Sequence, residues 1–365
     1  MSLLRASGTR RPGWADPRAV ALAVLVTGPL LSCSSEQATP PDAAAQLESR
    51  YIGTVRKVGP SVVKITTEFG QGSGIVLDSK GDILTNAHVV TSEPTFSSPR
   101  NTAAAHISVS TKGALDQTAD LKGCFVRSDV AVIHVGNSDL QPARFGDSDK
   151  LHVGQIVLAI GSPYDLDGTV TSGIVSALDR VLSEGTDPST PGAPLLPSLA
   201  GLIQTNAQIN PGNSGGALVD LDGTVVGMPT LGSESSAIGF AIGISKAKDY
   251  ADQILKFGKV NDSHLGILGL DFDRHVVNGA VLPDGVVVKG VVPGKGASQA
   301  DIRPGDLITS VNGKDTHDVS QYLDVLAPLK PGQRVPVGTR RGGSTQIVSV
   351  TLTPYVDAGG CSETL

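Results

Sequence analysis

Short runs in which apolar and polar residues alternate make up much of the chain from Tyr51 onward. This period of two is typical of half-buried strands, and many of the residues are β-branched, which also favours strands. Turn residues such as those of Ser79–Asp82 separate one run from the next. The pattern predicts strands at Ser61–Thr67, Gly74–Leu77, Ile83–Thr85, Ile107–Ser110, Val130–Val135 and Ile156–Ile160.

Helical spacing is clearest in one segment, Ser245–Phe257, where apolar residues recur three and four positions apart. A shorter helix is predicted near Ser320–Leu326, and Leu182–Ser198 has no periodicity and is expected to form a long surface loop. Many short strands with few helices favour an antiparallel barrel or sandwich. The 44 glycines and 23 prolines among 365 residues fit this turn-rich, mainly β architecture.

The first 32 residues have the features of a signal peptide. A basic stretch precedes the apolar run Ala19–Leu31, which is too short for a membrane span. The sequence Leu30–Cys33 is similar to a bacterial lipobox, which would make Cys33 the lipidated first residue of the mature protein. We therefore expect an exported protein of the cell envelope, lipid-anchored to the outer face of the cell membrane. Residues 33–50 are expected to form a flexible tether.

Charge and cysteine content narrow the function further. The net charge is −6, and the signal segment is basic, so the remainder is more acidic still and nucleic acid is not expected as a partner. Three scattered cysteines do not form a zinc framework, and neither a metal nor a cofactor is expected. An exported protein could pair Cys124 with Cys361, but Cys124 adjoins an apolar strand and Cys361 lies in a tail, which favours unpaired thiols.

The candidate chemistry centres on Ser214, which lies in the glycine-rich segment Asn210-Pro-Gly-Asn-Ser-Gly-Gly216. A serine hydroxyl becomes a strong nucleophile only with a base to take its proton and donors to stabilise the oxyanion. Glycines allow the N–H groups of Gly212 and Ser214 to point at one spot. The segment therefore predicts a nucleophile with an adjoining oxyanion hole.

A base and an orienting acid are available upstream. His88 follows a predicted strand, and Asp129 immediately precedes the apolar run Val130–Val135. Taken singly, His88 is more often a structural histidine and Asp129 an ordinary residue at the start of a strand. His134 lies within a strand and is interpreted as a core or surface residue. His264, His275 and His317 belong to the C-terminal part of the chain.

The segment around Ser214 also fits G-x-S-x-G, the nucleophile elbow of α/β-hydrolases. That elbow needs a strand before it, a helix after it and the order Ser, acid, His. Here Pro211 precedes the serine and a strand–turn–strand pattern follows it, over Ala217–Val226. The order His88, Asp129, Ser214 is that of chymotrypsin, so the hydrolase alternative is rejected.

Together, these segments resemble the HtrA (DegP-like) serine proteases, which have a two-barrel chymotrypsin fold. The resemblance spans roughly 51–355 and implies that His88 is the general base and acid, Asp129 its orienter, and Ser214 the nucleophile. It is carried by Thr85-Asn-Ala-His88, Ser128-Asp-Val-Ala-Val-Ile133 and Asn210–Gly216, and further by Gln71-Gly-Ser-Gly-Ile-Val-Leu77, Ile160-Gly-Ser-Pro-Tyr164, Thr169–Ser176 and Ile238–Ile242.

Two positions depart from the family pattern, Asn206 where Asp is common and Pro229 where Asn is common. Pro229 lies near the expected specificity pocket, which Gln208 and Ile209 are also expected to line. These departures bear on substrate preference more than on the chemistry. A preference for small or medium aliphatic residues is implied by the resemblance.

The C-terminal part resembles a PDZ domain through Arg303-Pro-Gly-Asp-Leu-Ile-Thr-Ser-Val-Asn-Gly313. Such domains add a peptide C-terminus as a strand and hold its carboxylate with backbone N–H groups. The resemblance gives this role to Leu265, Gly266 and Ile267, although the plain interpretation of Leu265 and Ile267 is strand core.

The expected organisation is a signal peptide at 1–32, a tether at 33–50, a chymotrypsin-like protease domain at 51–247, a linker helix at 248–263, a PDZ domain at 264–355 and a tail at 356–365. We expect a serine endopeptidase that degrades misfolded or damaged envelope proteins, captures peptide C-termini and, by resemblance, forms a homotrimer. The alternative is a PDZ-bearing chaperone or scaffold with a latent protease domain.

Overall fold

The structure is a computed structural model of the chain. It describes residues 42–92, 102–111, 116–136, 139–161, 169–182, 199–232, 238–260, 262–272, 276–277, 280–281, 285–317, 319–326 and 328–354. The predicted signal peptide, the lipidation candidate Cys33, nearly all of the loop at 182–198 and the tail at 356–365 lie outside these ranges.

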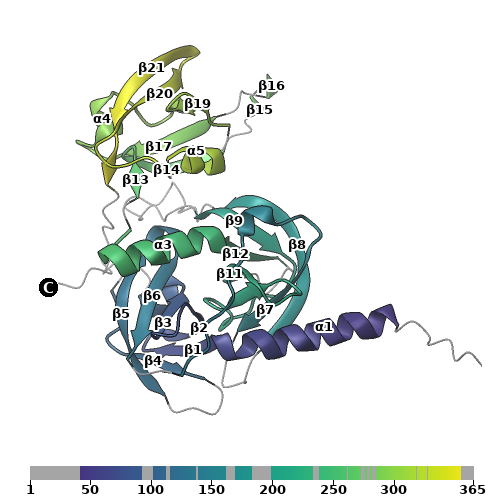
Figure 1. The fold of residues 1–365 in the computed structure, drawn as a ribbon. Helices are drawn as coiled ribbons and strands as arrows, with labels where there is room; N and C mark the ends of the chain where they lie inside the picture. The colour runs from purple at the N-terminus through teal and green to yellow at the C-terminus, as the bar shows by residue number, and fades with distance from the viewer. Residues whose placement is uncertain are drawn as a thin grey trace, which may run out of the picture. The chain divides into compact units, whose positions relative to one another are not determined.

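Six antiparallel strands close the first barrel, with the order β1-β2-β3-β6-β5-β4 (Figure 1). Four of the predicted strands here are close to the observed bounds, because apolar residues at alternate positions fill the barrel interior. The exceptions are β2, which begins four residues before the predicted Gly74, and β5, which was not predicted. Val63, Ile65 and Ile133, for example, are fully buried. The strands are β1 (Val62–Thr67), β2 (Gly70–Val76), β3 (Asp82–Thr85), β4 (Ile107–Ser110), β5 (Gln117–Phe125) and β6 (Val130–Val135).

A second closed barrel follows, with the order β10-β11-β12-β9-β8-β7. Short helical turns lie before, within and between the barrels: the 3-10 turn η1 (Gly59–Ser61), α2 (Ala87–Val90), and the 3-10 turns η2 (Val126–Ser128) and η3 (Ser148–Lys150). The strands of the second barrel are β7 (Ile156–Gly161), β8 (Thr169–Leu182), β9 (Leu199–Thr205), β10 (Ala217–Val219), β11 (Val225–Gly232) and β12 (Gly239–Gly243).

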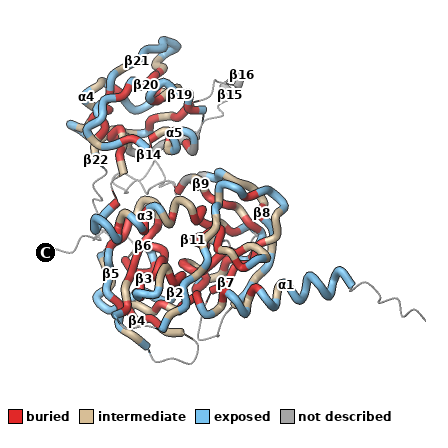
Figure 2. The backbone as a smooth tube through the Cα atoms, viewed as in Figure 1, coloured by how far each residue is buried: buried red, intermediate tan, exposed pale blue. Residues whose placement is uncertain are grey.

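One hydrophobic cluster contains buried residues of both barrels and of the helix α3 (Ile244–Phe257). Leu84 and Val132 of the first barrel belong to the same buried group as Ile160 and Met228 of the second, and Tyr250 of α3 packs edge-on against Phe125. Figure 2 shows these buried segments concentrated inside the barrels. The shared core fixes the junction of the barrels, where the segments bearing His88, Asp129 and Ser214 meet.

The N-terminal helix α1 (Ala43–Val58) corrects the expectation of a flexible tether for residues 43–50, which are helical, while residues 33–41 lie outside the described ranges. Its residues are mostly exposed (Figure 2), but Thr54 and Val58 are buried. Thr54 donates a hydrogen bond to the carbonyl of Leu221, and Arg50 pairs with Asp222. Contacts with the turn between β10 and β11 thus stabilise a helix whose 16 residues would be only marginally helical in isolation.

The C-terminal domain contains a sheet of order β14-β17-β18-β20-β21, with β19 paired to β18, and a separate core formed by residues such as Val288, Ile308 and Tyr322. The predicted short helix is α5 (Val319–Leu326). The remaining elements are β13 (Ser263–His264), β14 (Ile267–Phe272), β15 (Val276–Val277), β16 (Ala280–Val281), β17 (Val286–Val291), α4 (Gly296–Gln299), β18 (Leu307–Val311), β19 (Lys314–Asp315), β20 (Arg334–Arg341), β21 (Ser344–Thr351) and β22 (Thr353–Pro354).

Cys124, at the end of β5, is disulfide-bonded. The sequence-based preference for unpaired thiols is therefore wrong for this residue. An apolar neighbourhood indicates burial but is compatible with either redox state, so it was a poor guide to pairing. Within the described ranges, no helix is both long and apolar enough to cross a membrane.

Candidate active site

His88 and Asp129 form a close pair at the end of the first barrel. The Nδ1 atom of His88 lies 2.8 Å from Oδ2 of Asp129, and the backbone N–H of His88 donates to Oδ1 at 3.0 Å. His88 lies on α2, directly after β3, while Asp129 follows η2 with a left-handed φ of 53°. Two contacts from one residue fix the carboxylate plane relative to the imidazole.

This arrangement determines the useful tautomer of His88. A carboxylate accepts hydrogen bonds, so the proton of the neutral ring is on Nδ1, and Nε2 is the nitrogen that can accept a proton. Asp129 is only 7% exposed, whereas the side chain of His88 is 38% exposed. The acid is therefore shielded from water while the histidine reaches the surface of the site.

Thr230, on β11 of the second barrel, also bonds to the acid. Its hydroxyl donates to Oδ2 of Asp129 at 2.5 Å, and the residue is 3% exposed. The side-chain amide of Asn86 donates to the backbone carbonyl of Asp129 at 2.9 Å. Donors from both barrels thus hold Asp129. Sequence reasoning missed Thr230, and its position next to Pro229 was the only local signal.

Ser214 lies in a turn that precedes β10. Its hydroxyl donates to the carbonyl oxygen of Thr230 at 3.1 Å, so Thr230 contacts both Ser214 and Asp129. The N–H of Gly215 donates to the carbonyl of Pro229 at 3.0 Å, which attaches the turn to β11. The structure therefore brings together all three residues that the sequence selected, and β11 connects Ser214 with Asp129.

Residues Asn210–Asn213 form a β-turn closed by a hydrogen bond from the N–H of Asn213 to the carbonyl of Asn210, 3.0 Å long. Pro211 stands at the second position, and Gly212 at the third has a φ of 94°. A positive φ at the third position with proline at the second is characteristic of type II. This turn type sets the orientation of the peptide that carries the Gly212 N–H, because type I differs from it by a flip of that peptide.

Neither the Gly212 N–H nor the Ser214 N–H donates a hydrogen bond within the described part of the chain. One amide belongs to the candidate nucleophile itself, and the other to the residue two positions before it. They are therefore available to an oxyanion that forms next to Ser214.

Of the three residues assigned to the specificity pocket, Ile209 and Pro229 lie at β11, whereas Gln208 bonds to β8. Ile209 is 5% exposed and packs closely against two glycines. A Cβ added to Gly232 would lie 2.2 Å from the carbonyl oxygen of Ile209, and one added to Gly239 would lie 2.6 Å from its Cγ1. Gln208 is exposed, and its carbonyl accepts a hydrogen bond from Thr171. Pro229 is buried on β11. An aliphatic side chain thus borders this region.

Another histidine of the first barrel, His134, has a structural pairing. Nδ1 of His134 lies 2.7 Å from Oδ1 of Asp82, and the two residues are directly opposed on β6 and β3. The pair therefore joins neighbouring strands of one sheet, unlike His88 and Asp129, which connect two turns.

In the C-terminal domain, the segment assigned to carboxylate capture leads into β14, whose first residue is Ile267. Leu265 is fully buried, and Gly266 has a φ of 86°. The N–H of Gly266 donates to Nδ1 of His264 at 2.9 Å. An incoming carboxylate would compete with His264 for this amide, which the sequence did not indicate.

Family comparisons agree with the two parts of the fold. A model described as a trypsin-like peptidase domain matches residues 72–228, and a PDZ domain model matches 249–352. The chain is 36% identical over 302 residues to the periplasmic pH-dependent serine endoprotease DegQ of Escherichia coli. The aligned region covers 80% of this chain and 62% of DegQ. It is 33% identical over 299 residues to the putative serine protease HhoB of Synechocystis, covering 79% of this chain and 67% of HhoB.

Solved structures give the same result. The HtrA-type protease AlgW with a decapeptide matches with a TM-score of 0.65 and 26% identity, over 84% of this chain and 99% of AlgW. The serine endoprotease from Yersinia pestis matches with a TM-score of 0.61 and 32% identity, over 84% of this chain and 98% of the other. The chain spans about three fifths of the length of DegQ.

Proposed function

Because this chain belongs to the HtrA family of serine proteases, with a trypsin-like domain followed by one PDZ domain, we propose that it is a serine endopeptidase that degrades misfolded or damaged proteins of the cell envelope. The observation that supports this most directly is the contact of His88 with Asp129, 2.8 Å long, at the junction of barrels that also holds Ser214. The periplasmic location in the name of DegQ supports an exported location for this chain.

In the proposed reaction, Oγ of Ser214 attacks the carbonyl carbon of a peptide bond while Nε2 of His88 takes its proton. The amides of Gly212 and Ser214 stabilise the resulting oxyanion. Collapse of the tetrahedral intermediate breaks the C–N bond, and His88 gives its proton to the departing amine. Water then hydrolyses the acyl-enzyme by the same route. Asp129 holds the imidazole and stabilises its positive charge, but keeps no proton itself.

A second candidate is a PDZ-bearing chaperone or scaffold whose protease domain is latent. One observation favours it, since the Ser214 hydroxyl donates to the Thr230 carbonyl at 3.1 Å. In the proposed reaction this hydroxyl must rotate toward His88. Hydrogen bonds of serine proteases are often looser before substrate binds, so the same observation is compatible with an active enzyme.

Turnover of unfolded casein by the purified chain decides between the two. We expect cleavage by the native protein and none by Ser214→Ala, with both proteins equally folded by circular dichroism. Equal turnover, or none in either protein, would contradict the protease assignment. Suppression of aggregation by both proteins without cleavage would support the chaperone.

Three further parts of the proposal concern partners and location. Leu265, Gly266 and Ile267 would bind the C-terminus of a peptide, with the strand-like mode of PDZ domains. Titration with carboxylated and amidated forms of one peptide tests this, and equal affinities would contradict it.

Mass spectrometry should find an acylated Cys33 at the mature N-terminus, and light scattering should give the mass of a trimer. An unmodified Cys33 or a monomeric mass would overturn the respective assignment.

A further inference from the structure

Ser73 of the first barrel contacts the turn that carries the two candidate oxyanion donors. Its hydroxyl donates to the carbonyl oxygen of Gly212 at 2.6 Å, and its backbone N–H donates to the carbonyl oxygen of Ser214 at 2.8 Å. These are the same two residues whose N–H groups lie next to the nucleophile. One residue, on β2, thus bonds to both.

Ser73 is itself held firmly. It is fully buried, and its carbonyl accepts a hydrogen bond from the Thr85 hydroxyl at 2.7 Å. The neighbouring Gly215 has a φ of 79°, and a Cβ at that position would lie 2.2 Å from the Ser73 carbonyl oxygen and 2.4 Å from the Thr85 hydroxyl oxygen. The backbone of the turn is therefore pressed against β2 and β3, and only glycine fits at Gly215.

Small displacements of the Gly212 and Ser214 amides would weaken their stabilisation of the oxyanion. Oxyanion donors act when they lie about 2.7–3.1 Å from the charged oxygen, and a catalytic constellation tolerates roughly 0.5 Å of error. Gly212 has the wide conformational freedom of glycine, so its type II geometry needs support from outside the turn. The bonds from Ser73 supply such support from the opposite barrel.

We propose that Ser73 is a positioning residue of the oxyanion hole, which acts by holding the Gly212 and Ser214 carbonyls so that the N–H groups of these residues converge on the reacting oxygen. This inference rests on the proposed peptidase function. It assigns no contact between Ser73 and the substrate. Loss of the Ser73 hydroxyl would leave the buried Gly212 carbonyl without this donor, and the turn would gain freedom that misplaces the amides.

The test compares Ser73→Ala with Thr54→Val. Thr54 is also buried, at 3% exposure, and its hydroxyl also donates to a backbone carbonyl, at 2.7 Å, but it lies on α1 and contacts Leu221. Each variant loses one buried hydroxyl-to-carbonyl bond, so both should lower the Tm. Only Ser73→Ala should change the chemistry.

We expect kcat of Ser73→Ala on a short fluorogenic peptide to fall about tenfold or more, with KM unchanged, because losing one oxyanion donor outright costs 10²–10³ in kcat. The affinity for a peptide boronate, whose tetrahedral adduct resembles the intermediate, should fall by the same factor as kcat/KM. Thr54→Val should keep kcat within about twofold. Values for Ser73→Ala that equal those of Thr54→Val, or a rise in KM alone, would overturn the proposal.

Two additions keep the test decisive. If Ser73→Ala does not fold, Ser73→Cys retains a weak donor of similar size and should show the same split between kcat and KM to a smaller degree. Boronate affinity measured by calorimetry reports the oxyanion geometry even without turnover. If the native protein binds the boronate but cleaves no peptide, the result counts against the peptidase function. If both Ser73 variants bind the boronate as tightly as the native protein does, the result counts against the role of Ser73.

Discussion

The Thr230 hydroxyl donates to the same carboxylate oxygen of Asp129 that lies 2.8 Å from Nδ1 of His88. Thr230 belongs to the second barrel and Asp129 to the first, and 101 positions separate them in sequence. The acid of the candidate triad is therefore held across the junction of the barrels. Its orientation depends on the packing of both.

Thr230→Val removes this hydroxyl while keeping the shape of the side chain. We expect kcat to fall about tenfold, equivalent to ~1.4 kcal/mol of barrier, because Asp129 keeps its charge but loses one of its positioning bonds. Asp129→Asn should cost far more, about 10⁴-fold, since the amide favours the wrong tautomer of His88. Steady-state kinetics on one peptide measures both. A Thr230→Val variant with native kcat would show that the Thr230 bond is not needed to orient the acid.

Ile209→Ala should widen the substrate preference. Ile209 fills the space beside Gly232 and Gly239, and truncation leaves room for a larger side chain. We expect cleavage after bulkier residues such as Phe to rise relative to cleavage after Val, by about 10-fold given the 1–3 kcal/mol that a hydrophobic pocket contributes per methylene. Mass spectrometry of products from a peptide library measures the shift. An unchanged profile would place Ile209 outside the specificity pocket.

His264→Gln should flatten the pH dependence of stability in the PDZ domain. Burial lowers the pKa of His264 to about 4, below the value of 6.5 in an unfolded chain. Between these values the unfolded state binds a proton that the folded state does not, so stability is greatest above pH 6.5 and decreases as the pH falls toward 4. A protonated Nδ1 also loses its capacity to accept the Gly266 N–H.

Hydrogen exchange of peptides from β17, recorded across pH 4 to 7 after correction for intrinsic rates, would localise this effect. The exposed His317 offers a control, because His317→Gln should leave the native pH dependence in place. Persistence of the native pH dependence in His264→Gln would assign it to other groups.

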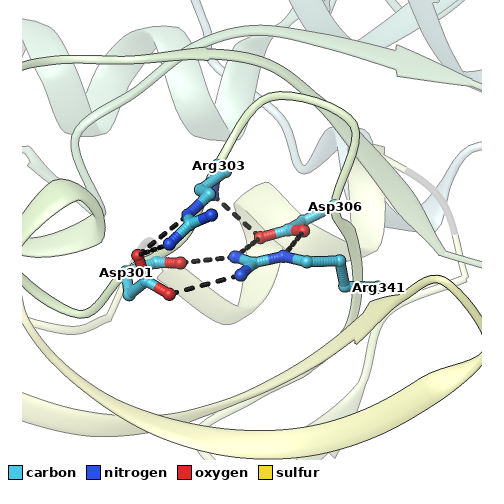
Figure 3. Close-up of polar contacts among 4 residues, drawn as sticks. All are labelled: Asp301, Arg303, Asp306 and Arg341. Carbon is cyan, nitrogen blue, oxygen red and sulfur yellow. Dashed lines mark hydrogen bonds and ion pairs between the residues drawn. The ribbon is translucent and has the colours of Figure 1, made fainter.

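Arg341→Ala should destabilise the PDZ domain. Figure 3 shows Arg341 between Asp301 and Asp306, and its Nε and one terminal nitrogen contact the two carboxylate oxygens of Asp306 at 2.6 and 2.7 Å. Asp306 is 1% exposed. Burial alone would raise the pKa of Asp306, but the hydrogen bonds from Arg341 and the Arg303 N–H lower it overall. An unpaired buried carboxylate remains after the substitution.

We expect a loss on the order of 3 kcal/mol in the free energy of unfolding of this domain. Arg341→Lys should recover only part of it, since an ammonium lacks the planar fork that contacts both oxygens. Arg340→Ala is the matched control, one position away on β20. Denaturant titration followed by proteolysis of the C-terminal domain gives the values, and equal stability of the two alanine variants would contradict the role of the ion pairs.

Local motifs of the sequence were enough to predict the fold class and the candidate catalytic residues. The motifs around His88, Asp129 and Ser214 can each be recognised from neighbouring residues alone, because turns and strand alternation depend on short-range sterics. The same holds for the helix expected at Ser245–Phe257, which is observed as Ile244–Phe257. The family assignment followed from these motifs together.

Other features depend on contacts that no local pattern specifies. The helix α1 persists through its contacts with Leu221 and Asp222, and the sequence around Ala43 alone favoured a flexible segment. The disulfide state of Cys124 depends on where a distant sulfur lies. Such outcomes follow from the arrangement of the whole chain, because isolated helices of this length are marginal and two thiols pair only when the fold brings them together.

The sequence by itself determined which groups carry the candidate chemistry, since side-chain identity fixes what can attack, accept a proton or donate a hydrogen bond. Only the tertiary structure decided how those groups are held. Ser73 and Gly212 are 139 positions apart, and Thr230 and Asp129 are 101 apart, yet each pair forms a buried hydrogen bond. Closing two barrels on a shared core brings these residues into contact, and hydrogen-bond geometry is satisfied only at that final packed stage.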